Sequence, residues 1–166
     1  GIPVLKPLIE SLRAEELTRV SGIINGTSNY ILTAMEEGSS YEDALKEAQE
    51  LGYAEPDPTN DVEGIDAKYK AIILSMICFG ATPVTDAVFT KGISDITKED
   101  FSWAKRLGKT IKLVAVVENE EGFNARVTPV LLDTKHPLAS IRGALNAVVC
   151  CAASSIACGK LVVKPL

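Results

Sequence analysis

The chain has 166 residues, of which 46% are hydrophobic and 23% are charged, as in an ordinary soluble globular domain rather than a disordered or fibrous chain. Its 22 acidic and 17 basic residues give a net charge of −5, which disfavours a nucleic-acid-binding surface because such surfaces depend on Lys and Arg. The longest strongly apolar run covers residues 71–81 and is too short for a bilayer, which takes about 20 residues.

A strand is the first predicted element of the chain. It covers residues 17–25, which are rich in Val and Ile and end at an Asn-Gly turn. A helix over residues 27–37 follows, with Thr27 as its capping residue. A second helix begins after Ser40 and ends at Gly52, so that the two helices form a hairpin.

An acidic segment comes next. Two prolines make residues 53–64 a stiff loop without regular structure, because proline lacks a backbone donor and restricts the residue before it. A helix over residues 65–79 follows this loop. Apolar side chains cover most of its circumference after Lys70, so we expect this helix to be buried.

The second half of the chain is rich in strands. A capping pattern at residues 97–100 opens a helix that ends at Gly108. Because the elements lack the regular βαβ alternation of a doubly wound sheet, we predict an α+β fold: a mixed, largely antiparallel β-sheet with helices packed on one face. The strands predicted here cover residues 84–90, 110–117, 123–132 and 146–150, of which the second and third form a hairpin.

The four cysteines indicate a reducing compartment. Cys150 and Cys151 are adjacent, which is awkward geometry for bridging each other, and Cys78 lies in an apolar helical pattern. The fourth is Cys158, and no Cys-x-x-Cys pair is present for zinc. We expect buried free thiols and a location in the cytoplasm, or in the plastid stroma of a photosynthetic eukaryote.

The most informative region is residues 55–70, in which five acidic residues precede two lysines. The segment does not match a calcium-binding EF-hand loop, because Val62 occupies the position that requires glycine and Lys68 the final position that requires glutamate. Asp66 and Lys70 are four residues apart on a predicted helix and can therefore touch. They form either a solvated salt bridge or a lysine poised to exchange a proton with a substrate oxygen.

A second candidate site is the turn at residues 25–29, where a strand meets the start of a helix. Either free backbone N–H groups at this turn hold a carboxylate or phosphate, or Thr27 simply caps the helix. Residues 108–110 match the end of a nucleotide-binding phosphate loop, but Trp103 occupies the position of the first glycine, so this motif is excluded. No Gly-x-Gly-x-x-Gly follows a predicted strand, so the chain shows no dinucleotide cradle.

These segments resemble the homoserine dehydrogenase family. The residues up to Lys70 carry the family's signature at many fixed positions, a segment at the first turn looks like its substrate loop, and a later segment looks like its downstream marker. The resembling residues are Ala48-x-x-x-Gly52-Tyr53-Ala54-Glu55-Pro56-Asp57-Pro58-Thr59-Asn60-Asp61-Val62-Glu63-Gly64-Ile65-Asp66-x-x-x-Lys70, then Gly22-Ile23-Ile24-Asn25-Gly26-Thr27-Ser28-Asn29-Tyr30-Ile31-Leu32, and finally His136-Pro137-Leu138-Ala139 with Gly143-Ala144-Leu145-Asn146-Ala147.

The resemblance implies an NAD(P)-dependent oxidoreductase that interconverts aspartate 4-semialdehyde and homoserine, in the biosynthesis of threonine, methionine and isoleucine. It implies a small-molecule substrate, NADP or NAD as the cofactor, a sodium ion and a homodimer, with no nucleic-acid or membrane partner. The Val-rich runs 113–117 and 127–132 are candidates for the dimer surface, although either could serve a core instead. The alternative function is a non-catalytic dimerisation or amino-acid-sensing module that retains the pocket.

The resemblance also assigns roles by position. Lys70 resembles the family's catalytic lysine, which exchanges a proton with the substrate oxygen, and Asp66 resembles the carboxylate that supports this lysine. Glu55 and Asp61 match acids of the substrate pocket, and Glu55 suits the substrate ammonium. Ile2 is the one position that corresponds to a main-chain ligand of the family's sodium ion. The other matching pocket positions are Gly26, Thr27 and Tyr53.

The resemblance covers residues 1–149, the expected catalytic and dimerisation domain. Residues 150–166 are expected to form a divergent C-terminal segment of the same domain. Because family members begin with a nucleotide-binding domain, we expect that domain to be absent here, and the cofactor-binding residues stay unassigned. The 166 residues alone are therefore expected to be inactive.

Overall fold

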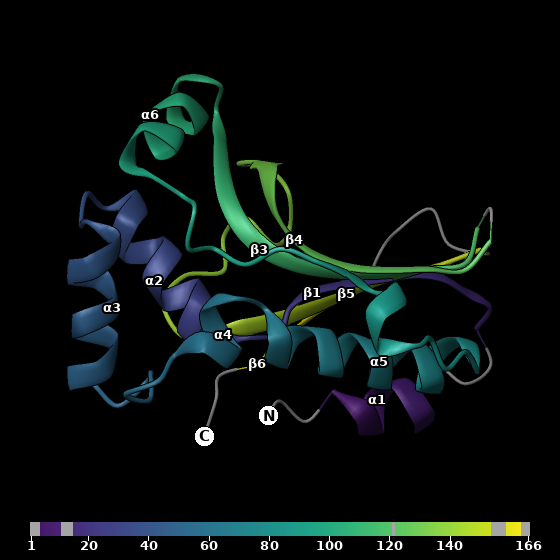
Figure 1. The fold of residues 1–166 in the computed structure, drawn as a ribbon. Coiled ribbons are helices and arrows are strands. Elements are labelled where there is room, and N and C mark those ends of the chain that lie inside the picture. The colour runs from purple at the N-terminus through teal and green to yellow at the C-terminus, as the bar shows by residue number, and fades with distance from the viewer. Residues whose placement is uncertain (1–3, 11–14, 121, 154–158, 164–166) are drawn as a thin grey trace.

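The structure is a computed structural model that describes residues 4–10, 15–120, 122–153 and 159–163 (Figure 1). No helix among these residues is long and apolar enough to cross a membrane. The helices are α1 (Leu5–Glu10), α2 (Gly26–Glu36), α3 (Tyr41–Glu50), α4 (Thr59–Val62), α5 (Ile65–Phe79), the 3-10 helix η1 (Thr85–Ala87) and α6 (Lys98–Arg106). The strands are β1 (Leu17–Ile23), β2 (Phe89–Thr90), β3 (Lys109–Glu118), β4 (Asn124–Asp133), β5 (Asn146–Ala152) and β6 (Gly159–Val163).

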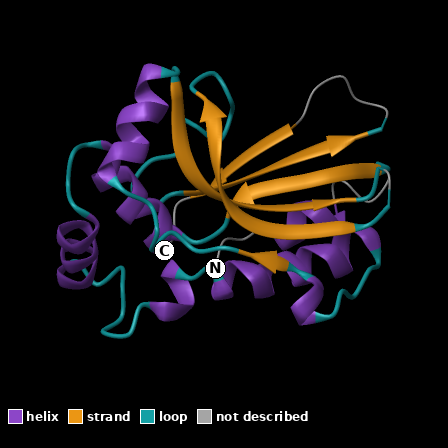
Figure 2. Ribbon diagram, turned by 45° about the horizontal axis from the view of Figure 1, so that its top comes forward, coloured by secondary structure: helices purple, strands orange, loops and turns teal. Residues whose placement is uncertain are grey.

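The strands form one six-stranded sheet in the order β2-β4-β3-β1-β5-β6. Among the described strands, β2 and β4 pair in parallel and the other four neighbouring pairs are antiparallel. Figure 2 shows the strands as one curved layer, and in Figure 1 α1 and α5 lie beneath that layer. The predicted α+β fold, with a mixed, largely antiparallel sheet and helices on one face, is confirmed.

Strand β3 is buried on both faces of the sheet. Leu113 and Val117 belong to the larger core, whose other members include residues of the helices, whereas Val114 and Val116 belong to a smaller core on the opposite face. This alternation follows from the two-residue period of side chains along a strand. The run 113–117, one of the two candidate dimer surfaces, therefore serves the core of the chain, and the dimer stays a prediction.

The helices α2, α3, α5 and α6 are confirmed, with ends within a residue or two of those predicted. The capping residue of α2 is an exception. Asn25 caps this helix, because its Oδ1 atom accepts a hydrogen bond of 2.8 Å from the Ser28 N–H. Thr27 lies inside the first turn, where its hydroxyl donates instead to the Tyr53 carbonyl, so the prediction of Thr27 as the cap is wrong.

Two predictions of local structure are also wrong. The acidic segment contains the short helix α4, because Asp57 Oδ1 accepts a hydrogen bond from the Thr59 N–H and turns the backbone. The strand predicted over residues 84–90 is wrong for most of its length, because residues 85–87 form the 3-10 helix η1, in which the Ala87 N–H donates to the Val84 carbonyl, and only Phe89–Thr90 form strand β2. Helix α1 and strand β6, which have only 6 and 5 residues, were not predicted from the sequence.

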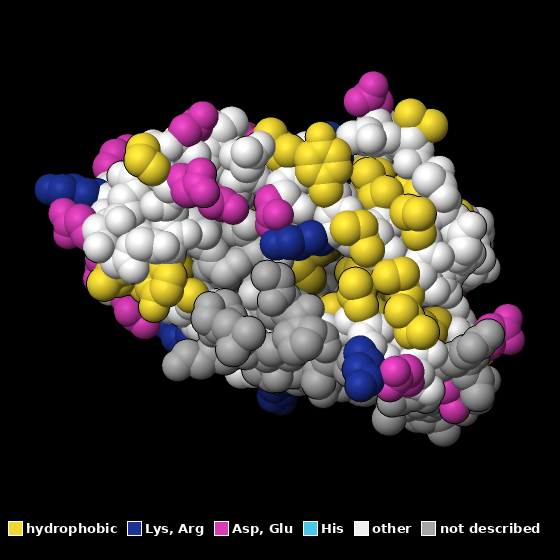
Figure 3. Space-filling view, turned by 90° about the horizontal axis from the view of Figure 1, so that it is seen from below, with side chains coloured by type: hydrophobic (Ala, Val, Ile, Leu, Met, Phe, Trp, Pro, Cys, Tyr) yellow, Lys and Arg dark blue, Asp and Glu magenta, His cyan; other side chains and the backbone are white. Residues whose placement is uncertain are grey.

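Helix α5 is buried on one side only, which corrects the prediction of a buried helix. Ala71 and Leu74 are buried in the larger core. Tyr69, Ile73 and Met76 are 54%, 45% and 50% exposed. Seen from below, apolar side chains gather over the region of α5 and α1 (Figure 3). An apolar circumference does not specify how many neighbours a helix has, and the described residues cover one side.

The cysteines follow the prediction in part. Cys78 and Cys150 are free thiols, and burial raises the pKa of Cys78 to about 12. Cys151 is disulfide-bonded, so the expectation of a free thiol is wrong for this residue. Cys151 lies in β5, which pairs antiparallel with the unpredicted strand β6. Cys158 lies outside the described residues.

Candidate functional site

Lys70 lies in the first half of α5, and its ammonium is held by two oxygens. Its Nζ atom donates to Asp66 Oδ2 at 2.5 Å and to the Ile24 carbonyl at 3.2 Å. The side chains of Lys70 and Asp66 are 36% and 33% exposed. The Lys70 ammonium has three N–H donors. Among the described residues, it has two hydrogen-bond acceptors, Asp66 Oδ2 and the Ile24 carbonyl. The third donor can therefore reach a substrate oxygen.

Asn25 connects the turn after β1 to α4 and α5. Its Nδ2 atom donates to Asp61 Oδ1 at 2.7 Å and to Asp66 Oδ2 at 2.9 Å, while its Oδ1 atom caps α2. Asp66 thus accepts from both Asn25 and Lys70. The structure brings the predicted residues Asp61, Asp66 and Lys70 together through this one amide.

The role of Asn25 in the site was not predicted from the sequence. The available signal was its type and place, because Asn directly after a strand and before a helix is a favoured capping residue. Its second role depends on contacts with residues 36 and 41 positions later in the chain. No local pattern reports contacts at such a separation.

The first turn of α2 forms the other side of the candidate site. The Thr27 hydroxyl donates to the Tyr53 carbonyl at 2.6 Å, and the rings of Tyr30 and Tyr53 lie 5.0 Å apart. A Cβ atom on Gly26 would lie 2.8 Å from the Ala144 carbonyl oxygen, so glycine allows a close approach of two backbones. The predicted residues Gly26 and Thr27 directly follow Asn25, and Tyr53 lies beside them.

Glu55 lies apart from these contacts. Its backbone carbonyl accepts a hydrogen bond from Gln49 Nε2 at 3.2 Å, which ties the acidic segment to α3. Its side chain is exposed, and among the described residues its carboxylate has no hydrogen bond or ion pair. Glu55 is thus an unpaired carboxylate that a cationic group could reach.

The acidic segment is fixed by hydrogen bonds of its own and by a close approach to a later loop. The Thr59 hydroxyl and N–H both donate to Asp57 and lower the pKa of that carboxyl. The Ile93 N–H donates to the Val62 carbonyl at 2.7 Å. At Gly92 a Cβ atom would lie 2.3 Å from that carbonyl oxygen, so only glycine fits here. This contact holds α4 in place beside Asn25.

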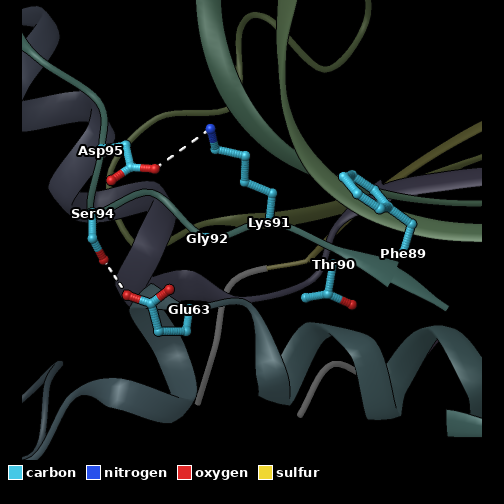
Figure 4. Close-up of a pocket in the computed structure, with 7 residues that line it drawn as sticks. All are labelled: Glu63, Phe89, Thr90, Lys91, Gly92, Ser94 and Asp95. Carbon is cyan, nitrogen blue, oxygen red and sulfur yellow. Dashed lines mark hydrogen bonds and ion pairs between the residues drawn. The ribbon is translucent and has the colours of Figure 1, made fainter. Parts of the chain in front are cut away.

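A separate pocket of about 430 Å³ adjoins the acidic segment at Glu63. Figure 4 shows its two polar contacts, between Ser94 and Glu63 and between Lys91 and Asp95. The Ser94 hydroxyl donates to the Glu63 carboxylate, and the Lys91–Asp95 ion pair has an N–O distance of 3.4 Å. The pocket contains none of the residues predicted for the site, and nothing in the sequence analysis indicated it.

A metal ion needs several ligating side chains close together, and a dinucleotide needs a βαβ unit. The described residues contain no group of three or more His, Cys, Asp or Glu side chains that could hold a metal ion. Ile2, the predicted sodium ligand, lies outside the described residues. The single parallel strand pair, β2 and β4, has another strand, β3, between its members in the chain, so the described strands form no βαβ unit.

Comparison with known proteins identifies the family. The family model for homoserine dehydrogenase matches residues 3–164. The chain belongs to the homoserine dehydrogenase family. The resemblance predicted from the signature residues is thus confirmed.

Curated homoserine dehydrogenases match this chain along most of its length. The enzyme of Mycobacterium tuberculosis (strain ATCC 25618 / H37Rv) is 49% identical over 156 residues, which are 90% of this chain and 35% of that protein. The enzyme of Bacillus subtilis (strain 168) is 47% identical over 150 residues, covering 89% of this chain and 35% of that protein. The chain therefore spans about a third of the length of the curated homoserine dehydrogenases it matches.

Solved structures of homoserine dehydrogenases have the same fold. The Thiobacillus denitrificans homoserine dehydrogenase matches with a TM-score of 0.92 and 43% identity, over 98% of this chain and 38% of that one. A hyperthermophilic archaeal homoserine dehydrogenase mutant in complex with NADPH matches with a TM-score of 0.78 and 32% identity, over 98% of this chain and 45% of that one.

Proposed function

We propose that this chain supplies the substrate-binding and proton-transfer residues of a homoserine dehydrogenase, which interconverts aspartate 4-semialdehyde and homoserine. One observation carries the proposal. Lys70, Asp66 and Asn25 form a continuous hydrogen-bonded chain at the junction of β1, α2 and α5, next to Asp61. Such a constellation, in a chain of this family, presents a lysine N–H to a substrate oxygen and holds it in position.

The proposed task of Lys70 is to exchange a proton at the substrate oxygen. In the direction of reduction, Lys70 Nζ donates to the carbonyl oxygen of the semialdehyde as negative charge develops there. In the direction of oxidation, the neutral amine accepts the hydroxyl proton of homoserine. Asp66 and the Ile24 carbonyl hold the nitrogen in place during both steps. The hydride is carried by NADP or NAD.

The charged ends of the substrate amino acid have complementary partners. The first N–H groups of α2, at Gly26 and Thr27, lie at a helix N-terminus, where backbone donors and the helix dipole favour a carboxylate. The unpaired carboxylate of Glu55 and the partly exposed Asp61 favour the substrate ammonium. This arrangement supports binding homoserine with its hydroxyl toward Lys70.

The test is turnover of a protein in which this chain is joined to a nucleotide-binding domain. We expect homoserine-dependent reduction of NADP or NAD. The matched control is 2-aminobutyrate, which has the same ammonium and carboxylate but no hydroxyl, and we expect it to compete without being oxidised. Binding of both compounds without any turnover would contradict the enzyme and favour an amino-acid-sensing module.

Several further proposals follow from membership of the family. We propose a homodimer, NADP or NAD as the cofactor, a sodium ion near Ile2, and a cytoplasmic or plastid location. We also propose that the division between residues 1–149 and 150–166 separates the catalytic and dimerisation domain from its divergent C-terminal segment. The nucleotide-binding domain is proposed to lie outside these 166 residues, which alone would be inactive.

A further inference from the structure

A fully buried lysine lies in β3, one of the two middle strands of the sheet. Lys112 of β3 is 0% exposed, although charged groups are rarely buried so completely. Its hydrogen-bond acceptor among the described residues is Asn29 Oδ1, at 3.2 Å. Burying an ammonium costs free energy unless it is paired, so its retention in a core strand calls for a reason.

The charges around Lys112 come from α2 and from the segment that precedes β5. Glu36, the last residue of α2, and Glu37, which caps that helix, favour its ammonium, and Arg142 opposes it. The Arg142 guanidinium itself pairs with Glu36 at 2.6 Å and Glu37 at 2.9 Å. Burial has the largest influence on the pKa of Lys112, which it lowers to about 8. The ammonium is thus held mainly by its bond to Asn29.

Asn29 connects this lysine to the loop before β5. Its side chain is 0% exposed, and its Nδ2 atom lies 2.9 Å from the Gly143 carbonyl, 3.1 Å from that of Leu145 and 3.3 Å from that of Ile141. An ammonium can donate but cannot accept, so its contact with Oδ1 keeps Nδ2 directed at these carbonyls. Lys112 thereby fixes the orientation of the Asn29 amide.

The segment 141–145 reaches the candidate site through one residue. Its Ala144 carbonyl lies in the close backbone contact with Gly26 described above. The Gly143 N–H adds a hydrogen bond of 3.0 Å to Thr33 Oγ1 on α2. The position of Gly26, whose N–H opens α2, therefore depends on how firmly this segment is held.

We propose that Lys112 and Asn29 are positioning residues, which hold the 141–145 segment against α2 so that the Gly26 and Thr27 N–H groups keep the geometry that binds the substrate carboxylate. The role assigned to these N–H groups rests on the proposed function. Neither residue touches the substrate. Loosening the segment weakens substrate binding and leaves proton transfer at Lys70 in place.

Two substitutions test the two halves of this connection. Lys112→Met keeps the apolar stem and removes the donor to Asn29, and it removes a buried charge, so we expect the protein to fold. Asn29→Asp keeps an acceptor for Lys112 and removes both N–H donors to the carbonyls of the segment. The matched control is Lys109→Met, in the same strand at a partly exposed position.

In the chain joined to a nucleotide-binding domain, both variants are expected to raise the KM for homoserine about tenfold, the effect of losing one buried hydrogen bond. We expect kcat to change by less than about twofold, because the loss affects ground state and transition state alike. A purely structural role would lower the melting temperature and leave KM unchanged. If either Lys112→Met or Asn29→Asp folds and its KM for homoserine stays within about twofold of the wild-type value, the proposal is overturned.

A second measurement uses the 166 residues alone and needs no turnover. Amide hydrogen exchange at Gly143 and Leu145 is expected to be about tenfold faster in both variants than in the wild type and in Lys109→Met. Unchanged exchange would overturn the connection itself. The wild type could also fail to bind or oxidise homoserine while amide exchange at Gly143 and Leu145 still becomes faster in both variants. In that case the proposed function is wrong, and the connection between Lys112 and the 141–145 segment is supported.

Discussion

Replacing Lys70 with Ala is expected to abolish most turnover while leaving the fold intact. Loss of a positioned general acid–base group lowers kcat by about 10²–10⁴-fold. The side chain is 36% exposed, and its ion pair with Asp66 contributes no more than about 1 kcal/mol to stability after screening by water. We therefore expect Lys70→Ala, in the chain joined to a nucleotide-binding domain, to lose kcat with a nearly unchanged melting temperature.

Lys68→Ala provides the matched control for this change. Lys68 lies two residues earlier on α5 and is partly exposed, so its removal alters the charge of the same helix by the same amount. We expect this variant to keep wild-type kinetics. If Lys70→Ala retained activity within about twofold of the wild type, Lys70 would have no part in the chemistry.

Replacing Asn25 with Asp is expected to have the second largest effect. The new carboxylate can still accept from the Ser28 N–H and cap α2, so the helix is expected to form. It cannot donate to Asp61 or Asp66, which leaves three carboxylates together, and like charges at this range repel. Displacement of Asp66 moves its partner Lys70 out of position. We therefore expect kcat/KM to fall about 10²-fold.

Asn60→Asp is the control for Asn25→Asp, because it adds the same charge to the same acidic segment at an exposed position of α4. Its kcat/KM is expected to match that of the wild type. Steady-state kinetics with homoserine, together with thermal unfolding, distinguish the two variants. Equal losses in both would mean that the added charge, and not the Asn25 hydrogen bonds, is responsible.

The elements that could be predicted are those whose signals are local. Helix α5 was predicted over its observed residues, 65–79, because a glycine precedes its first turn and another glycine follows its last. Helix α6 carries a capping box between Thr97 and Asp100 that is visible in the sequence. The short elements α1 and β6 were missed, since six or fewer residues leave little periodicity to detect.

The candidate site was also predicted in part, from helix spacing and from the family resemblance. The spacing of Asp66 and Lys70 indicated their contact, because residues four apart on a helix are neighbours. The resemblance indicated Asp61, Gly26 and Thr27, and the structure gathers these residues at the start of α2 and beside it.

What could not be predicted depends on pairs far apart in the chain. Asn25 reaches Asp66 across 41 positions, and Lys112 reaches Asn29 across 83. Lys112, which lies between apolar residues inside β3, is the one local sign of the second contact. The capping role of Thr27 was assigned wrongly for a related reason, because its hydroxyl is taken by the Tyr53 carbonyl, 26 positions away.

The most direct test of the proposed function is a crystal structure of this chain, joined to a nucleotide-binding domain, with homoserine bound. We predict the hydroxyl oxygen of homoserine within about 3.2 Å of Lys70 Nζ, its carboxylate at the Gly26 and Thr27 N–H groups, and its ammonium near Glu55. Homoserine bound instead in the pocket between Glu63 and Lys91, with Lys70 still joined only to Asp66 and Ile24, would contradict it.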